Sequence, residues 1–512
     1  MRTKQRALSL VVALLSLATL IGVTSAIRND ELSGVAAGGI GDGGELGFGG
    51  DGAVGPDGIG EPGAPGVDGS GPGAVGPGAR TGGTSTNGPG GTQRGGPQGP
   101  GGATSETGPI RVAYTYVNLA GLGASVGGVD PTTDSTKMDR EFKALFDDLN
   151  AKGGIGGRRI EYRGFEFSFA EFMSEDSQVR RCSQIAQDFK AHYVLDTYVY
   201  GPGGQECFAR NRVPIITLSS TLAEETLLKA RPYVTTTFPT IDSQFRALAP
   251  KLKEVGYLAG AKVGVFLDQT PRVDGPYRNI LEPSLRAAGT PVAAVARAGI
   301  NDQDGIRNAE STFASAGVTH VIFIGNYLQF ASFTQQAQTQ ESTYRYAVND
   351  YYTLAATATT GQTMHDTQLK GMVAVSVCND PDGCIVEDNT RNPANRSPYT
   401  DRNRLAPGLR RCLDTMTRLR GADYYNPNNQ STGTKTACEH FFLWTDAIAA
   451  GGGADLARFA AGVRSLRAWQ APRVFGTDFA DGRHTGASHY AVGKFDTLCR
   501  CMVRATPWTR PA

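Results

Sequence analysis

Residues 138–167 constrain the fold most, because a helix, a tight turn and a strand follow one another there. Glycines at 153–154 end the helix, since glycine reaches the left-handed C-cap conformation without a Cβ clash. Residues 160–167 then alternate as in a strand, and 110–119 form an apolar strand upstream. This order predicts a right-handed β-α-β crossover between parallel strands. The helix has one apolar face at helical spacing: Met138, Phe142, Leu145, Phe146 and Leu149.

A Gly/Ala/Ser loop at 121–125 precedes this helix, and the segment 149–162 is LNAKGGIGGRRIEY. Together with the crossover, these features resemble the opening of type I periplasmic binding proteins. The branch they resemble is that of branched-chain amino acid and amide receptors serving ABC importers. The resemblance extends from about residue 109 to the C-terminus. It implies an α/β fold of two Rossmann-like lobes joined by a three-strand hinge, with lobe 1 at 109–236 plus 378–475 and lobe 2 at 237–377 plus 476–512.

Helices and strands continue to alternate along the chain, as in α/β lobes that bind ligands at the carboxyl ends of their strands. The resemblance places the hinge crossings near 233–239, 373–377 and 474–478. Two polar stretches, 378–404 and 424–436, depart from the family pattern. The further helices expected are 179–189, 243–256, 277–289, 304–316 and 328–338, and the further strands are 192–200, 214–218, 263–268, 292–297, 320–325 and 344–350.

The N-terminal 108 residues divide into an export signal and a spacer. Residues 1–26 have a basic start, an apolar run and a small-residue cleavage site, which predicts a secretory signal and an extracellular or cell-surface protein. The uncharged run 7–27 is also long enough to be an uncleaved signal-anchor, and that alternative stays open. Residues 27–108 are Gly/Pro-rich without apolar periodicity, so we expect a disordered spacer. The net charge of +1 gives no reason to expect nucleic acid as a partner.

Eight cysteines in an exported chain indicate disulfides rather than a metal site. Cys182 and Cys207 fall on consecutive crossover helices that should pack side by side. A zinc site would need His or Cys pairs on a shared framework, so we expect no metal and no cofactor. The expected pairs are Cys182–Cys207 and Cys378–Cys384. Cys412 and Cys438 fall on two helices assigned to lobe 1, and an i, i+2 bridge between Cys499 and Cys501 is geometrically awkward. The pairing of these last four cysteines therefore stays open.

Residues 123–127 match G-x-S-x-G, the nucleophile elbow of α/β-hydrolases. The elbow normally follows a central strand after several βα units, whereas this motif follows the first strand. A loop that cradles a ligand is the other explanation. We therefore expect no catalysis, and keep a secreted serine hydrolase using Ser125 as the alternative function.

The resemblance also implies a set of ligand-binding residues at strand ends that face the gap between the lobes. Hydroxyls and backbone N–H groups can hold a carboxylate, and tyrosines supply apolar walls with a polar tip. Asp350 would hold an ammonium group, although an aspartate at a strand end is also an ordinary helix N-cap. Lobe 1 would contribute Ser125, Tyr198, Tyr200, Gly201, Ser219, Ser220 and Thr221, and lobe 2 would contribute Gln269, Tyr277, Asn326, Tyr327, Asp350 and Tyr351.

The function implied by the resemblance is that of an exported solute-binding protein. It would capture an amino acid or similar small polar metabolite by closing its lobes. An ABC permease would receive the ligand, or a membrane sensor would detect the closed form of a ligand-sensing ectodomain. Contact with the membrane is expected only through the N-terminal segment.

Overall fold

The chain divides into two units, Met1–Thr92 and Gln93–Ala512. All residues described below belong to the second unit. The expected signal, the spacer before Gly108, Ser125, Tyr198, Tyr200, Gly201, Cys384 and Cys499 lie outside the described residues. The computed structural model describes residues 108–118, 131–172, 174–196, 202–300, 302–354, 364–379, 385–386, 402–426, 429, 431–480, 482, 484–498 and 500–510.

The first sheet has five parallel strands in the order β2-β1-β3-β4-β5. Helix α2 (Pro131–Ala151) connects β1 to β2, and Ile110 pairs with Ile160 in parallel register. The crossover predicted from residues 138–167 is therefore confirmed. The strands are β1 (Ile110–Asn118), β2 (Ile160–Ser168), β3 (Tyr193–Asp196), β4 (Ile215–Thr217) and β5 (Val234–Thr236).

The turn between α2 and β2 shows why its sequence is so constrained. Gly154 has a φ of +74°, and a Cβ there would collide with the carbonyl oxygen of Arg158. The Asn150 side chain donates to the carbonyl oxygen of Ile160 at 2.9 Å and accepts from its N–H at 2.7 Å. The Asn150 side chain thus satisfies both backbone groups of Ile160 and fixes the end of the helix to the start of the strand.

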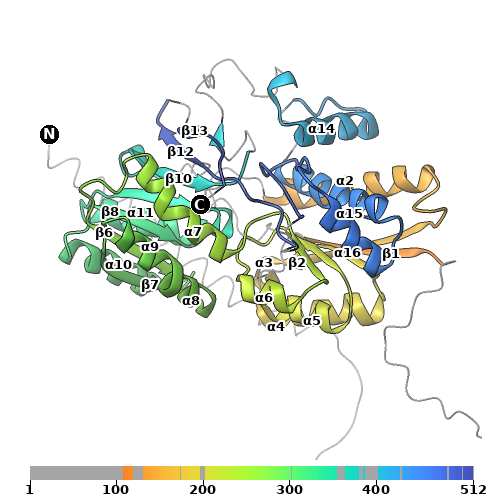
Figure 1. Ribbon diagram of the computed structural model, residues 1–512, viewed down its shortest axis with the longest axis horizontal. Helices are drawn as coiled ribbons and strands as arrows, with labels where there is room; N and C mark the ends of the chain where they lie inside the picture. Colours follow the sequence, from red (N-terminus) through yellow and green to blue (C-terminus); the bar gives the residue numbers. More distant parts are fainter. Residues whose placement is uncertain are drawn as a thin grey trace, which may run out of the picture. The chain divides into compact units, whose positions relative to one another are not determined.

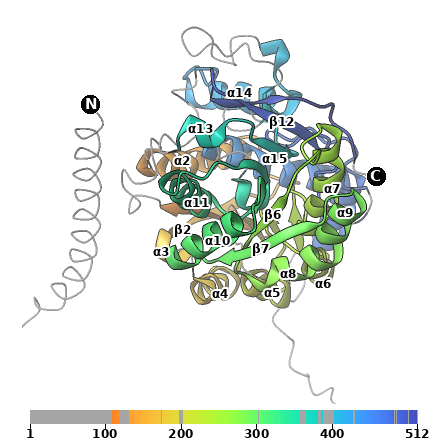
Figure 2. The ribbon, with the colours of Figure 1, turned by 90° about the vertical axis from the view of Figure 1, so that its left-hand side faces the viewer.

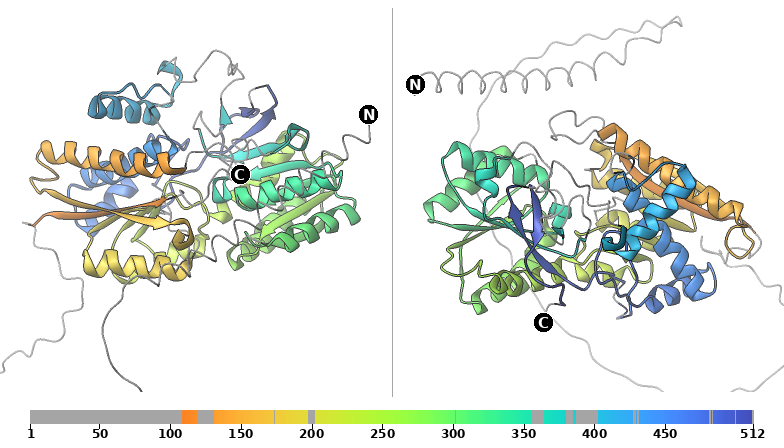
Figure 3. Two further views of the ribbon diagram at one scale, coloured as in Figure 1. Left: turned by 180° about the vertical axis from the view of Figure 1, so that it is seen from behind. Right: turned by 90° about the horizontal axis from the view of Figure 1, so that it is seen from above.

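Both faces of the first sheet are covered by helices. Val112 and Tyr114 belong to the same buried cluster as Phe142 and Trp444, whereas Ala113 faces a second cluster. Figure 1 shows α2, α15 and α16 over one face, and α4 and α5 over the other. In the left view of Figure 3, α2 (orange) and α4 (yellow) lie on opposite faces of the strands. These helices are α4 (Glu175–Ser183), which continues into a π-helical turn, η2 (Gln184–Asp188), α5 (Pro202–Arg210), α15 (Thr432–Gly451) and α16 (Leu456–Ser465).

The second sheet has eight strands in the order β11-β13-β12-β10-β9-β8-β6-β7. Five neighbouring strands of this sheet, in the spatial order β7-β6-β8-β9-β10, are parallel, and they repeat the strand order of the first sheet. The C-terminal strands β12 and β13 extend it in antiparallel fashion. The strands are β6 (Val263–Asp268), β7 (Val292–Ala298), β8 (His320–Ile324), β9 (Arg345–Asn349), β10 (Val373–Ser376), β11 (Ile385–Val386), β12 (Ala491–Asp496) and β13 (Cys501–Arg504).

Helices also cover both faces of the second sheet. Phe245, Leu248 and Leu252 of α7 pack with Val265 in one cluster, while Phe313 and Phe333 pack with Phe266 in the other. Figure 2 shows α7 and α9 on one side and α10 and α11 on the other. The remaining helical segments are α3 (Phe169–Phe172), α6 (Glu224–Lys229), α7 (Ile241–Glu254), η3 (Pro271–Val273), α8 (Asp274–Pro276), η4 (Tyr277–Leu281), α9 (Glu282–Ala287), α10 (Gln303–Ser315), α11 (Tyr327–Thr339), η5 (Tyr351–Thr353), α13 (Asp366–Leu369), η6 (Arg402–Arg404) and α14 (Pro407–Arg420).

Three features differ from the elements expected from the sequence. β11 pairs with β13, so Ile385 and Val386 belong to the second sheet, although 378–475 was assigned to lobe 1. Their side chains are buried, which favours pairing with β13 over an exposed connection. Residues 474–478 form isolated bridges, Cys378 with Val474 and Thr477 with Ala487, instead of a hinge strand. The expected helices 179–189 and 277–289 each contain a π-helical turn, η2 and η4, and in the second helix Pro283 follows the turn closely and lacks the N–H of a regular helix. The other lobe boundaries stay predictions.

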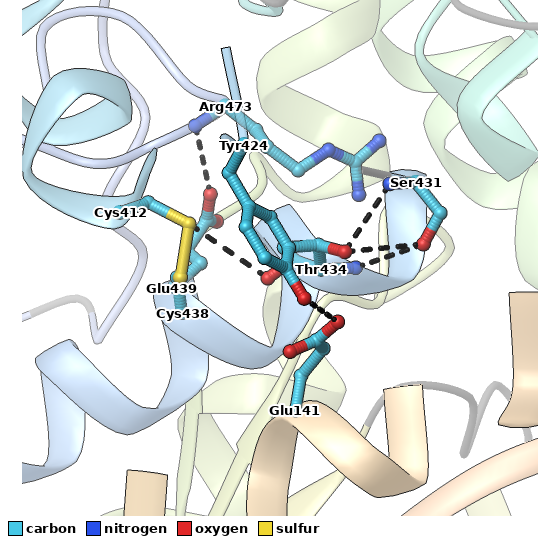
Figure 4. The surroundings of a disulfide bond; sticks show 8 residues. All are labelled: Glu141, Cys412, Tyr424, Ser431, Thr434, Cys438, Glu439 and Arg473. Carbon is cyan, nitrogen blue, oxygen red and sulfur yellow. Dashed lines mark hydrogen bonds between the residues drawn. A yellow bond between two sulfur atoms is a disulfide. The ribbon is translucent and has the colours of Figure 1, made fainter. Parts of the chain in front are cut away.

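Disulfides join two pairs of helices beside the first sheet. Cys182 of α4 is bonded to Cys207 of α5, as expected. Cys412 of α14 is bonded to Cys438 of α15 (Figure 4), a pairing that the sequence left open. Cys378 and Cys501 are also disulfide-bonded. Cys384 and Cys499 lie outside the described residues, so the pair Cys378–Cys384 stays a prediction and the partner of Cys501 stays open. Within the described ranges, no helix combines the length and apolar character needed to cross a bilayer.

Candidate functional site

Buried polar residues gather at the carboxyl ends of the parallel strands in both sheets. Asp196 ends β3 and Thr217 ends β4 in the first sheet, while Asp268 ends β6 and Asn349 ends β9 in the second. Each of these four side chains is at most 2% exposed. Such strand ends are where open α/β sheets bind ligands.

Three consecutive hydroxyls follow β4 on the first-sheet side. Ser219, Ser220 and Thr221 are all buried. The Ser219 and Thr221 side-chain oxygens lie 3.1 Å apart, and the Thr236 hydroxyl donates to the Ser219 carbonyl oxygen at 3.2 Å. These bonds fix the segment, so its hydroxyls are held in place before any ligand arrives.

On the second-sheet side, a carboxylate is surrounded by donors. Asp268 accepts from the Tyr351 hydroxyl at 2.8 Å, from Thr270 at 3.1 Å and from the Gln329 amide at 3.1 Å. Burial, followed by the charge of Asp268, raises the pKa of Tyr351 well above its ordinary value. The Tyr351 hydroxyl therefore stays protonated and donates a hydrogen bond to Asp268. Because its carboxylate already accepts these hydrogen bonds, Asp268 serves to position the side chains of Tyr351 and Thr270.

Two hydrogen-bonded bridges link the strand ends of the two sheets. Arg272, just beyond β6, donates from Nη1 to the Thr221 hydroxyl at 3.2 Å. The Gln244 amide of α7 donates to the Ser220 carbonyl oxygen at 2.7 Å and accepts from Asn349 at 3.0 Å. The bridges bring a guanidinium next to the hydroxyl segment. Guanidinium and hydroxyl donors together form an arrangement suited to a carboxylate.

No protein-family model matches the chain, and no curated protein matches it either. Solved structures do match. A branched-chain amino acid ABC transporter protein from Thermus thermophilus with bound valine is 15% identical, with a TM-score of 0.56, over 79% of this chain and 98% of its own. The fold is that of the type I periplasmic binding proteins.

Two further solved structures have this fold. The substrate binding protein LivJ from Streptococcus pneumoniae, in complex with isoleucine, is 14% identical over 79% of this chain and 100% of its own, with a TM-score of 0.54. A solute binding protein of an ABC transporter from Rhodopseudomonas palustris, in complex with 3,4-dihydroxy benzoic acid, is 12% identical over 78% and 97%, with a TM-score of 0.54. At such identities the similarity establishes the type I periplasmic-binding fold alone.

Within this fold, the expected ligand residues that the structure describes occupy different surroundings. Ser219, Ser220, Thr221 and Tyr351 lie at the bridged strand ends. Asn326 caps α11, accepting from the Gln329 N–H at 2.9 Å, and Tyr277 is buried in the π-helical turn η4. Gln269 is exposed, while Tyr327 is half-buried. Contact of any of these residues with a ligand stays a prediction.

Asp350 links two strand ends of the type I periplasmic-binding fold. Its carboxylate accepts from the Ser376 hydroxyl at 2.6 Å and from the Val377 N–H at 2.8 Å. It precedes η5 but makes no side-chain capping bond, which does not support the alternative that it is a helix N-cap. Burial raises the pKa of Asp350 to about 6, and its two hydrogen bonds oppose the rise. These bonds hold the end of β9 to the end of β10.

Replacing Asp350 by asparagine should remove a pH-dependent component of stability. The pKa of Asp350 in the folded protein exceeds the ordinary value of 3.8. Its contribution to the free energy of unfolding is therefore complete below about pH 4, and it is lost as the pH rises through about 6. The free energy of unfolding of the wild type should therefore fall by up to about 3 kcal/mol more than that of Asp350→Asn across this interval. Urea unfolding at pH 4 and 6.5 measures it. The exposed Asp176→Asn is the control, and an identical pH dependence in both variants would refute the assignment.

Two features of the site are not predicted by the family resemblance. Arg272 follows strand 263–268 by four residues, within a segment already expected near the ligand. Tyr352 has a φ of 49°, a conformation that non-glycine residues rarely adopt, and its ring packs edge-on against Tyr351 at 4.8 Å. Backbone strain of this kind concentrates at binding sites. No sequence signal distinguishes Tyr352 from Tyr351.

Proposed function

We propose that this protein is an extracellular solute-binding protein that captures a small organic carboxylate at the bridged strand ends. The observation that supports it most is the hydrogen bond between Arg272 and Thr221, beside Ser219 and Ser220. A ligand carboxylate offers two acceptor oxygens to this guanidinium and these hydroxyls. Valine, isoleucine and 3,4-dihydroxybenzoic acid, named with the similar structures, share a carboxylate despite different side groups.

Binding would act through the equilibrium between open and closed lobes. Because Arg272 belongs to the second-sheet side and Thr221 to the first, a carboxylate that contacts both stabilises the closed state over the open one. The closed form would then be recognised by an ABC permease, or by a membrane sensor. Ser125 lies outside the described residues, so the hydrolase alternative gains no support from the site.

The class of carboxylate ligand depends on which residues contact the rest of the ligand. An amino acid is the class proposed from the family resemblance, with Asp350 as the partner of its ammonium. The bonds from Ser376 and Val377 already use both oxygens of Asp350, so an ammonium would have to share them. An aromatic acid would instead need apolar walls, for which Tyr351 and Tyr352 are the proposed residues.

Calorimetric titration of the purified protein tests the carboxylate proposal. The panel pairs L-valine and L-isoleucine with their primary amides, and 3,4-dihydroxybenzoate with its amide. At least one acid should bind roughly 30-fold or more tightly than its amide, because the amide loses the charge-assisted bonds. Binding of L-isoleucine but not of 3-methylpentanoate, which lacks only its amino group, would identify a zwitterion site. Equal affinity for each acid and its amide would refute the carboxylate proposal.

A further inference from the structure

A cavity of about 840 Å³ lies at the opposite edge of the second sheet from the candidate site. Its lining includes the first residues of β8, β9 and β10, which are His320, Arg345 and Val373. Parallel strands start at one edge and end at the other, and β6 has six residues. The two edges are therefore roughly 20 Å apart. A ligand in this cavity would not occupy the site at the carboxyl ends.

The charged residues of the cavity lining are all basic. Arg345, Lys370 and Lys494 line it, and no aspartate or glutamate does. All three side chains are exposed, and within the described part of the chain none of them forms a salt bridge. Tyr257, Val373 and Phe495 supply apolar lining. The concentrated positive charge beside apolar surface matches an anionic group attached to an organic body.

His320 provides a buried polar atom in this lining. Its side chain is 7% exposed, and its Nδ1 lies 2.8 Å from the Thr319 hydroxyl. Among the described residues, its Nε2 has no hydrogen-bond partner. Tyr257 packs edge-on against the ring at 4.9 Å and donates its own hydroxyl to the Arg345 carbonyl oxygen at 2.6 Å, so the ring is held in place. When the Thr319 hydroxyl donates to Nδ1, the ring proton is on Nε2, which becomes a donor available to a ligand.

We propose that this cavity binds the phosphate group of an organic phosphate. The three cationic side chains would balance a charge of about −2, and His320 Nε2 would donate to one of the phosphate oxygens. Phosphate is favoured over a carboxylate because three cations and a separate N–H donor match an anion with several acceptor oxygens. The volume exceeds what a bare phosphate would fill, so the organic part would lie on Tyr257, Val373 and Phe495. Both a soluble phosphomonoester and a lipid headgroup carry such a group.

Titration with glycerol 3-phosphate and sedimentation with vesicles test this proposal and separate the two sources. The wild-type protein should bind glycerol 3-phosphate, or co-sediment with phosphatidic acid vesicles but not with phosphatidylcholine vesicles, more strongly at low salt than at high salt. The double variant Arg345→Gln, Lys370→Gln should weaken whichever binding occurs by about 10-fold or more. Both residues are exposed, so this variant should fold normally.

Two further variants make the test specific. Arg307→Gln removes an exposed arginine of α10 outside the cavity lining and should change the affinity less than about 2-fold. His320→Phe keeps the ring against Tyr257 but removes the Nε2 donor, and should also weaken binding. A carboxylate ligand found for the candidate site should bind all these variants as it binds the wild type. Absence of saturable binding to both phosphate probes, or an equal loss in Arg307→Gln, would overturn the proposal even if carboxylate binding is found.

Discussion

Replacing Arg272 by glutamine should weaken binding of a carboxylate ligand by about 2–5 kcal/mol, or roughly 30-fold to several thousand-fold. Arg272 is the cationic side chain that reaches from the second-sheet side to the Thr221 hydroxyl. In a closed and desolvated site, its loss would leave the ligand carboxylate without a charged partner, and glutamine restores only a neutral donor.

Isothermal titration with the tightest acid of the panel measures this effect, and thermal unfolding of the same samples monitors folding. Arg278→Gln is a matched control, because Arg278 lies six residues further along and its side chain is 69% exposed. The control should bind like the wild type. An affinity in Arg272→Gln within a factor of about two of the wild type would contradict the proposed carboxylate site, provided that the variant is folded.

The second large effect concerns acid stability and His440. This histidine lies on α15 and is fully buried. Burial, together with the nearby positive charge of Arg473, lowers the pKa of His440 to about 3. The folded protein therefore holds the ring neutral at a pH where the unfolded chain would protonate it.

The sign of the pH dependence follows from this lowered pKa. The contribution of His440 is complete above its ordinary pKa of 6.5 and is lost as the pH falls from there towards about 3. The total loss reaches about 5 kcal/mol, of which about 2 kcal/mol falls between pH 6.5 and 4.5. Over the range from pH 4 to 6 this dependence is opposite in sign to that of Asp350.

The variant His440→Leu, of similar volume, should lose about 2 kcal/mol less stability than the wild type between pH 6.5 and 4.5. Urea unfolding at the two pH values provides the measurement. His365 is exposed, so His365→Gln should keep the wild-type pH dependence. If His440→Leu loses as much stability on acidification as the wild type does, burial of this histidine is not a source of acid sensitivity.

The architecture was largely predictable because local signals and tertiary packing agree in this chain. The apolar face of α2 and the Gly153–Gly154 turn specify the first crossover, and Asn150 completes it through backbone contacts. The similar alternation in the second half gives a second sheet with the same parallel order. The resemblance to type I periplasmic binding proteins then predicted a fold that the solved structures support.

The site was less predictable, because its geometry depends on residues far apart in sequence. Ser219 to Thr221 could be expected from the strand before them, but the bridge to Arg272 spans 51 residues. The contact between Gln244 and Asn349 spans 105 residues. Likewise, the two-residue strand β11 has no detectable periodicity, and its position is set by pairing with the C-terminal strand β13. A single sequence carries no signal for such pairings.

The helices that cover the first sheet have a consequence for the order of folding. All five strands of this sheet are complete by Thr236, whereas α15 begins only at Thr432. Tyr193 of β3 packs edge-on against Trp444 at 5.8 Å and against Phe459 at 5.1 Å, and its hydroxyl donates to the Ala454 carbonyl oxygen at 2.5 Å. Helix α2 covers part of this face from the start, but a chain that emerges from its N-terminus exposes the apolar part around Tyr193 until some 200 more residues have followed. Truncation before α15 should leave an aggregation-prone sheet rather than an independently folded lobe.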